Sequence, residues 1–150
     1  MKCWNKPSNL HLERNPERRR QHRSKRMEIV AHKILLIEDD PIMLSLLETL
    51  LKMEGYQVVQ FSGEKLEDVT ITLRNEKPDL ALVDVNLRAF NGFEVLESIR
   101  CDANLKDIRV LMSSGLDVSI ECIQRGADYF ILKPYMPDDL IQSIRHVLGA

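Results

Sequence analysis

The chain has 150 residues, of which 44% are hydrophobic and 29% are charged. This profile is typical of a soluble globular protein and excludes collagen-like, mucin-like and wholly disordered classes. A chain of this length usually forms one domain and buries enough surface for an ordinary core. No apolar run approaches the ~20 residues that a membrane-spanning helix needs. No apolar segment follows the N-terminal basic residues, so a secretory signal is also excluded.

The charge is unevenly distributed along the chain. Residues 1–27 hold nine Lys/Arg against two acids, a net +7, whereas residues 28–150 carry a net −9. The first segment includes the run RRRQHRSKR (18–26) and hardly any aliphatic residues. We therefore expect a disordered basic tail over 1–27 and a single domain over 28–150. Met27 follows the basic run, and an alternative is that the native protein starts there.

Three cysteines occur, Cys3, Cys101 and Cys122, and no CxxC motif is present. The odd number and the wide spacing argue against a disulfide framework, a zinc site or thioredoxin-type chemistry. Unpaired thiols and a reducing cytoplasm are expected.

From Lys33 onward, strand and helix patterns alternate. In chain order we predict a strand at 32–37, a helix at 41–55, a strand at 56–61, a helix at 66–76, a strand at 79–85, a helix at 92–100, a strand at 109–114, a helix at 118–126, a strand at 129–132 and a helix at 137–148. In the first helix Pro41 suits the first turn and Gly55 the end, and the apolar face is predicted to comprise Ile42, Leu46, Leu47, Leu50 and Met53. Met53 and Met112 are expected in the core.

Strict alternation of strand and helix predicts an α/β fold: a doubly wound, five-stranded parallel sheet with helices on both faces. Ligands of such sheets bind beyond the carboxyl ends of the strands. The residues that follow each strand are therefore the candidates for function.

Polar residues follow four of the predicted strands: Glu38, Asp39 and Asp40; Asp84; Ser113, Ser114 and Gly115; and Lys133-Pro134. Most have an ordinary alternative, since Asp40 suits a helix N-cap and Ser114 or Lys133-Pro134 could lie in a solvated turn. Asp84 is harder to explain in this way. It ends the apolar run LALV, and a buried acid costs several kcal/mol unless it is paired or liganded.

Clustered carboxylates repel one another, and a divalent cation would remove that conflict. Oxygen ligands suit a hard ion, with Mg²⁺ the first choice. A carboxylate beside Mg²⁺, facing a lysine and a hydroxyl, could attack phosphorus while the metal and the lysine neutralise the growing charge.

Four segments together resemble one family: KILLIEDDP (33–41), PDLALVDVNLRAFNGFEVLESIR (78–100), RVLMSSG (109–115) and GADYFILKPY (126–135). They are similar to the receiver domain of two-component response regulators, a likeness that covers about 32–148. The resemblance implies the flavodoxin-like strand order 2-1-3-4-5.

The resemblance also implies roles for single residues. Asp84 would be the phosphoacceptor and Lys133 its charge partner, joined to Pro134 by a cis peptide. Ser114 would be the switch hydroxyl, with Gly115 as its small neighbour. The Mg²⁺ ligands would be Asp84, Asp39, Glu38 through water, and the backbone carbonyl of Asn86. Phe130 would be the aromatic ring that turns inward on activation, although plain core packing explains it equally well.

Four positions depart from the family pattern. Glu38 replaces the commoner Asp, Tyr135 replaces Phe, and Arg88 stands where Pro is usual, which predicts a less rigid loop. Leu116 offers no polar group to orient an attacking water, so we predict that the phosphoryl group persists longer than in members with a polar residue there.

The function implied is a phosphorylation-controlled signalling switch, not an enzyme, with Mg²⁺ as cofactor. A histidine kinase or a histidine phosphotransfer protein would supply the phosphoryl group. The surface formed by 118–125, 129–132 and 137–148 would report the change. Because the chain ends near the expected end of the receiver domain, output is expected through contacts with a protein partner, unless the chain is a fragment of a longer regulator.

The sequence leaves three alternatives to this function. A hydrolase with an Asp nucleophile would need an acid where Asn86 stands and a cap domain. The basic tail could bind nucleic acid with a steep salt dependence, but Trp4 is its only aromatic residue. An unphosphorylated pseudo-receiver is disfavoured because acceptor, acids, hydroxyl and lysine are all present.

Overall fold

Five parallel strands form the framework of the computed structural model, which describes residues 31–149. The strands are β1 (Lys33–Ile37), β2 (Gln57–Gln60), β3 (Leu80–Asp84), β4 (Arg109–Ser114) and β5 (Tyr129–Leu132). The helices are α2 (Pro41–Met53), α3 (Leu66–Glu76), α4 (Gly92–Cys101), α5 (Ser119–Gln124) and α6 (Pro137–Leu148). The strand order is β2-β1-β3-β4-β5, as expected from the resemblance. The expectations for residues 1–27 fall outside the described residues.

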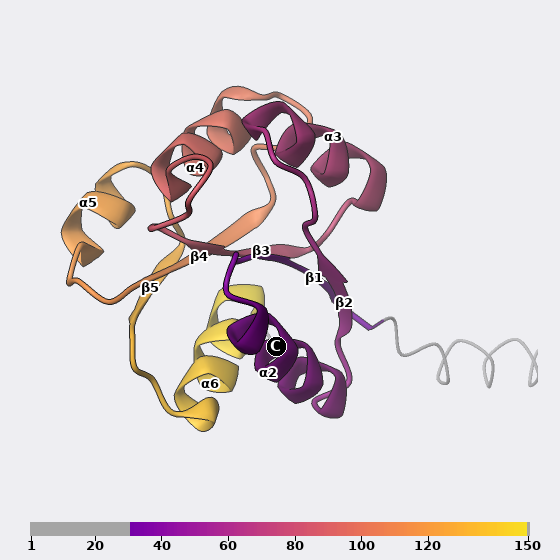
Figure 1. The fold of residues 1–150 in the computed structure, drawn as a ribbon, viewed down its shortest axis with the longest axis vertical. Coiled ribbons are helices and arrows are strands. Elements are labelled where there is room, and N and C mark those ends of the chain that lie inside the picture. Colours follow the sequence, from indigo (N-terminus) through magenta and orange to yellow (C-terminus); the bar gives the residue numbers. More distant parts are fainter. Residues whose placement is uncertain (1–30, 150) are drawn as a thin grey trace, which may run out of the picture. The chain divides into compact units, whose positions relative to one another are not determined.

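The sheet lies between two layers of helices (Figure 1). Helices α3, α4 and α5 cover one face, where Leu35, Ile37, Val83, Val95 and Met112 are among the buried residues of one core cluster. Helices α2 and α6 cover the other face, over a second cluster that includes Ile34, Leu36, Leu82 and Leu140. Because both faces are covered, the central strands are apolar at nearly every position.

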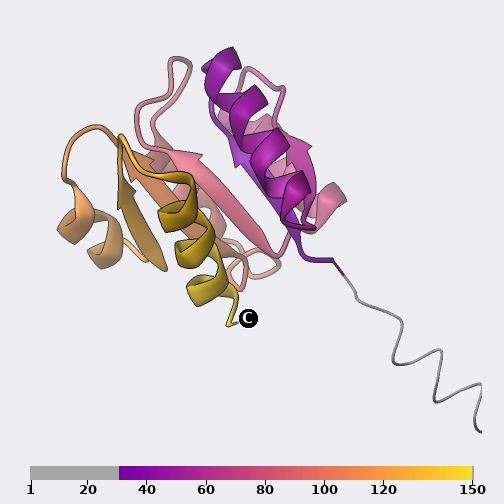
Figure 2. The same ribbon diagram turned by 90° about the horizontal axis from the view of Figure 1, so that it is seen from below.

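All five strands are parallel and therefore end at the same edge of the sheet; Figure 2 shows the sheet from below, with its strands running in one direction. Within the ladder, Asp84 pairs with Ser113 and Ser114 pairs with Leu132. Main-chain hydrogen bonds continue past the strand ends: Val85 N donates to Ser113 O at 2.9 Å, and Lys133 N donates to Ser114 O at 2.8 Å. The predicted site residues of β3, β4 and β5 therefore lie on neighbouring strand ends.

The predicted apolar face of the first helix is wrong in part. Leu47 is buried, but Ile42, Leu46 and Met53 are 73%, 63% and 80% exposed, and Met53 is not in the core. The buried residues of α2 are Leu47 and Leu51. The helix carries so many apolar residues that two overlapping stripes fit the 3.6-residue period, and only packing against the sheet selects one. Met112 is buried, as predicted.

Several element ends also differ from the prediction. Helix α2 ends at Met53 instead of 55, α5 spans Ser119–Gln124 instead of 118–126, and α4 extends to Cys101. Strand β1 begins one residue later than predicted, and β2 and β3 each lose one residue at either end. Helix ends fray. The last residue of a helix is assigned from its hydrogen bonds, which the sequence alone does not fix. Gly126 adopts a φ of 105° after α5, which fits its predicted role as a stop signal.

Cys101 and Cys122 are both free, in agreement with the expectation of unpaired thiols. Burial raises the pKa of the Cys122 thiol to about 11, so it packs as a neutral apolar group. Within residues 31–149, no helix combines the length and the apolar character that crossing a membrane requires.

Candidate functional site

Three of the predicted acids meet at the carboxyl edge of the sheet. Glu38, Asp39 and Asp84 each offer a carboxylate oxygen, and these oxygens lie within 4.8 Å of one another. Glu38 and Asp84 are buried, whereas Asp39, just after the first strand, is half-buried. Asp40 does not join the cluster. Its Oδ1 accepts hydrogen bonds from Ile42 N at 2.9 Å and Met43 N at 3.4 Å, which makes it the N-cap of α2.

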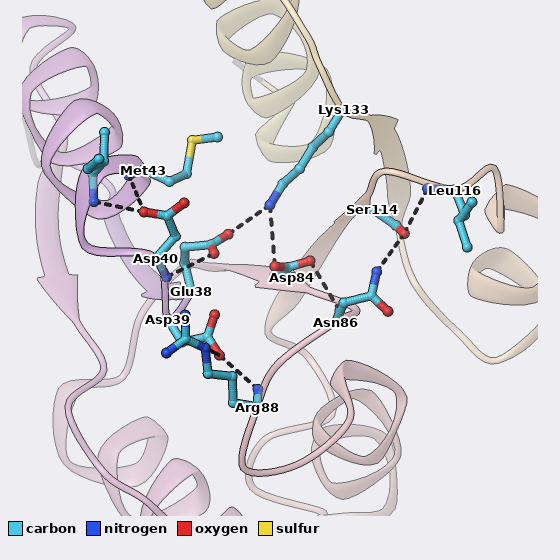
Figure 3. Close-up of polar contacts among 11 residues, drawn as sticks. Glu38, Asp39, Asp40, Met43, Asp84, Asn86, Arg88, Ser114, Leu116 and Lys133 are labelled. Atoms are coloured by element: carbon cyan, nitrogen blue, oxygen red, sulfur yellow. Dashed lines mark hydrogen bonds and ion pairs between the residues drawn. The ribbon is translucent and has the colours of Figure 1, made fainter.

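Lys133 bridges the buried pair of carboxylates (Figure 3). Its Nζ lies 2.9 Å from Glu38 Oε2 and 3.3 Å from Asp84 Oδ2. The side chain reaches the cluster from the end of β5, where the Lys133-Pro134 peptide bond is cis, as the resemblance implied. Asp84 Oδ1 also accepts a hydrogen bond from Asn86 N at 3.2 Å. The buried Asp84 is thus paired, as its place after LALV required.

Burial and pairing shift two pKa values in the cluster. Burial raises the pKa of Glu38 above its ordinary 4.5, and this effect outweighs the hydrogen bond from Lys133. Burial alone would lower the pKa of Lys133, but the hydrogen bond to Glu38 and the charge of Asp84 prevail and raise it. Lys133 therefore remains an ammonium group at neutral pH, opposite the acceptor candidate.

The hydroxyl of Ser114 lies on the other side of Asp84 and is almost fully buried. Its Oγ accepts a hydrogen bond from Asn86 Nδ2 at 3.2 Å and another from Leu116 N at 3.1 Å. A Cβ added at the neighbouring Gly115 would meet no atom within 4 Å. The Leu116 side chain is 71% exposed.

The loop between β3 and α4 is fixed at two points. Arg88 N donates to Asp39 Oδ2 at 2.7 Å, a bond that a proline at this position could not make. This bond ties the loop to the end of β1, and the lower rigidity expected from Arg88 stays a prediction. Gly92 begins α4 directly against the main chain of Asp84 and Val85, where an added Cβ would clash with the Asp84 carbonyl oxygen.

Two aromatic residues flank the site. Phe130 on β5 is partly buried and packs against the α3–α4–α5 core cluster, which fits both readings of this residue. Tyr135 follows the cis peptide and packs against the α2–α6 cluster, and burial raises the pKa of its phenol.

The donor set of the cluster fits Mg²⁺. All three side chains offer only carboxylate oxygens, and they come from two adjacent strand ends. Hard oxygen donors in small number are what this ion selects, since waters complete its octahedron. Among residues 31–149, no nitrogen or sulfur donor belongs to the cluster.

Sequence reasoning missed two contributors to this geometry. The Asn86 side chain was not expected to contact Ser114, because residues 28 positions apart carry no spacing signal. Gly92 was predicted only as part of a helix. A glycine directly after the N-cap Asn91 was the available signal that the start of the helix lies close to another segment of main chain.

The chain belongs to the response regulator receiver domain family, whose family model matches residues 34–145. Among curated proteins it is similar to the DNA-binding response regulator MtrA of Mycolicibacterium smegmatis, with 27% identity over 119 residues. It is also similar to the DNA-binding dual master transcriptional regulator RpaA of Synechocystis, with 34% identity over 120 residues. These matches cover 79% and 77% of the chain but 51% and 48% of the relatives, so the chain spans about half the length of the curated relatives it matches.

Solved structures show the same fold. The N-terminal domain of a response regulator receiver protein from Methanoculleus marisnigri is 30% identical, with a TM-score of 0.61 and coverage of 79% of this chain and 98% of that one. A response regulator structure from Chloroflexus aurantiacus is 24% identical, with a TM-score of 0.72 and coverage of 80% and 99%. The receiver domain of a Pseudomonas aeruginosa sensor histidine kinase, 23% identical with a TM-score of 0.70 and coverage of 80% and 99%, has a magnesium ion coordinated in its active site cleft.

Proposed function

We propose that this chain is a phosphorylation-controlled signalling switch of the cytoplasm, in which Asp84 accepts a phosphoryl group from the phosphohistidine of a kinase or of a phosphotransfer protein. The observation that carries the proposal is the position of Asp84. Its buried carboxylate ends β3, with an ammonium group on one side, a hydroxyl on the other, and two further carboxylates next to it.

The transfer needs one bond to form and one to break. An Asp84 oxygen attacks the phosphorus, the phosphorus–nitrogen bond of phosphohistidine breaks, and the imidazole leaves with the electron pair. Lys133 already faces Asp84 Oδ2 and is placed to stabilise negative charge on the phosphoryl oxygens. Asn86 N holds the second Asp84 oxygen at 3.2 Å and orients the carboxylate.

We assign the divalent-cation site to Asp39, Asp84, the backbone carbonyl of Asn86 and Glu38, the last through water. When bound, Mg²⁺ would neutralise charge on the carboxylates and on the incoming phosphoryl oxygens. Arg88 N keeps Asp39 turned toward the cluster. Lys133 supplies the positive charge that holds Glu38 and Asp84 together.

The phosphoryl group then changes the surface of the domain. Ser114 would turn its hydroxyl toward the new oxygens and move the β4–α5 loop, and Phe130 would occupy the space that this movement opens. Output would pass through protein contacts of α5, β5 and α6. This part of the surface includes exposed apolar side chains, namely Ile120, Leu132 and Met136.

The direct test is intact-mass analysis after incubation with Mg²⁺ and acetyl phosphate, a small phosphoryl donor. We expect the wild type to gain one phosphoryl group, and Asp84→Asn to gain none. Asp40→Asn is the matched control, because Asp40 neighbours the cluster but caps α2, and asparagine caps a helix as well as aspartate does.

Phosphorylation of Asp84→Asn at the wild-type level would overturn the assignment of the acceptor. If the wild type gains nothing from acetyl phosphate, a panel of histidine kinases with labelled ATP becomes the deciding test. Failure with every kinase while the fold is intact would reject the proposed function.

A further inference from the structure

The Asn86 side chain connects two parts of the site that are far apart in sequence. It extends from the β3–α4 loop to the end of β4, where its Nδ2 lies 3.2 Å from Ser114 Oγ (Figure 3). The same Oγ accepts the main-chain N–H of Leu116 at 3.1 Å. Two donors therefore hold one hydroxyl.

In both of these hydrogen bonds Ser114 Oγ is the acceptor. A serine oxygen has two lone pairs and one proton, and here both lone pairs face donors. Phosphoryl oxygens only accept hydrogen bonds, so Ser114 can contact them only by turning its proton toward Asp84. With Ser114 only 1% exposed, water cannot replace a bond lost in this movement.

We propose that the Asn86 side chain is a latch that holds the Ser114 hydroxyl in its unphosphorylated position. The latch rests on the proposed function, because its competitor is the phosphoryl group on Asp84. Asn86 is a positioning residue in this role: it acts on Ser114, and through Ser114 on the β4–α5 loop. This role belongs to the amide side chain, and is separate from the backbone carbonyl assigned to the cation.

A latch lowers the affinity of the site for any phosphoryl mimic. The mimic must first release Ser114. Its apparent affinity is therefore the intrinsic affinity multiplied by the fraction of molecules that are unlatched. Loss of one hydrogen bond of ordinary strength shifts such an equilibrium by about two- to tenfold. Substitution of Asn86 should therefore tighten binding, which is the opposite of what a purely structural role predicts.

The experiment is a double-mutant cycle with beryllium trifluoride and Mg²⁺ as the phosphoryl mimic, followed by NMR titration. We expect Asn86→Ala to bind the mimic about two- to tenfold more tightly than the wild type. In a Ser114→Ala background the same substitution should change nothing, because the latched hydroxyl is absent. Both backgrounds keep the Asn86 backbone carbonyl. An equal effect in the two backgrounds, or weaker binding by Asn86→Ala, would overturn the latch.

A second readout needs neither the mimic nor the metal. The Leu116 amide depends on Ser114 Oγ as its acceptor, so releasing Ser114 should speed its hydrogen exchange in Asn86→Ala by about the same two- to tenfold. The Lys77 amide is the internal control, because it donates to Leu73 O at 2.9 Å at the end of α3, outside the β4–α5 loop.

The two readouts separate the two proposals. A normal wild-type titration with an unchanged Leu116 exchange rate would overturn the latch and leave the proposed function standing. A wild type that does not bind the mimic, with faster Leu116 exchange in the variant, would reject phosphoryl binding while showing that Asn86 holds Ser114.

Discussion

Lys133 Nζ lies closer to Glu38 Oε2, at 2.9 Å, than to Asp84 Oδ2, at 3.3 Å. Lys133 thus contacts both acids, and its shorter contact is to Glu38, the acid that departs from the family pattern. The extra methylene of glutamate lets the carboxylate reach Lys133 from the end of β1. A residue that looked like a minor substitution in sequence therefore takes part in the central ion pair.

Stability should depend on pH through Glu38. Because burial raises the pKa of Glu38 above 4.5, the folded state holds this proton more tightly than the unfolded chain does. The free energy of unfolding therefore contains a contribution that falls as the pH rises from about 4.5 toward the raised pKa. Glu38→Gln removes this contribution, so its stability relative to the wild type should rise as the pH increases from about 4.5 through the raised pKa of Glu38. Denaturant unfolding in the presence of a chelator measures the difference.

Glu48→Gln is the control with the opposite sign. Hydrogen bonding to Lys52 lowers the pKa of the exposed Glu48, so its stabilisation is present above 4.5 and is lost as the pH falls. The stability of this variant relative to the wild type should decline as the pH rises. A Glu38 variant that follows the same direction would contradict the raised pKa.

Gly92→Ala should disturb the acceptor through the main chain. The added Cβ would press on the Asp84 carbonyl and on Val85, and overpacking of this kind costs about 1–3 kcal/mol. We expect a lower unfolding free energy and slower phosphorylation by acetyl phosphate. Gly115→Ala is the control for stability, since its Cβ meets open space, and it should change the unfolding free energy by less than about 0.5 kcal/mol. Equal losses in the two variants would show that the close contact at Gly92 is not the cause.

Leu116→Glu tests the lifetime of the phosphoryl group. A carboxylate at this exposed position could orient a water for attack, so decay of the phosphorylated form should become about three- to tenfold faster, below the ~10²-fold of a fully positioned general base. Ile120→Glu places the same charge at a comparably exposed position on α5 and should leave the decay rate unchanged. Intact mass followed over time gives both rates, and equal decay of wild type and Leu116→Glu would refute the prediction.

Arg100 should prove to be the main polar contributor to the stability of the α4–α5 side. Its guanidinium donates to the carbonyls of Gly126, Lys106 and Ile108 and pairs with Asp128 at 2.8 Å. Arg100→Met should lower the unfolding free energy by about 2–4 kcal/mol, because several charge-assisted bonds are lost and their acceptors are left without partners.

Arg145→Met is the comparison for Arg100. Arg145 makes an exposed pair with Glu54 at 2.9 Å, and such pairs contribute about 1 kcal/mol or less. Thermal or denaturant unfolding of the two variants measures the contrast. Similar losses would mean that Arg100 acts as a surface charge only.

The strands and the edge of the sheet that carries the site could be predicted because their signals are local. A buried strand reads as a short apolar run, and alternation with helices fixes the parallel sheet. Asp84 stood out because an acid ended such a run. The N-cap role of Asp40 was likewise a local signal, with a proline in the next position.

The remaining features depend on contacts between distant segments. Which apolar stripe of α2 is buried was decided by the sheet and not by the period, so Ile42 and Leu46 were placed on the wrong face. The bond from Asn86 to Ser114 and the contacts of Arg100 join residues that no spacing rule connects. Their partners become visible only when the loops are folded against one another.

The main-chain bonds beyond the strand ends have a consequence for how such domains diverge. Val85 N to Ser113 O and Lys133 N to Ser114 O join the three strand ends without using any side chain. The spacing of acceptor, hydroxyl and ammonium group is therefore insensitive to most substitutions around them. A neighbour that is only 24% identical shares this fold at a TM-score of 0.72.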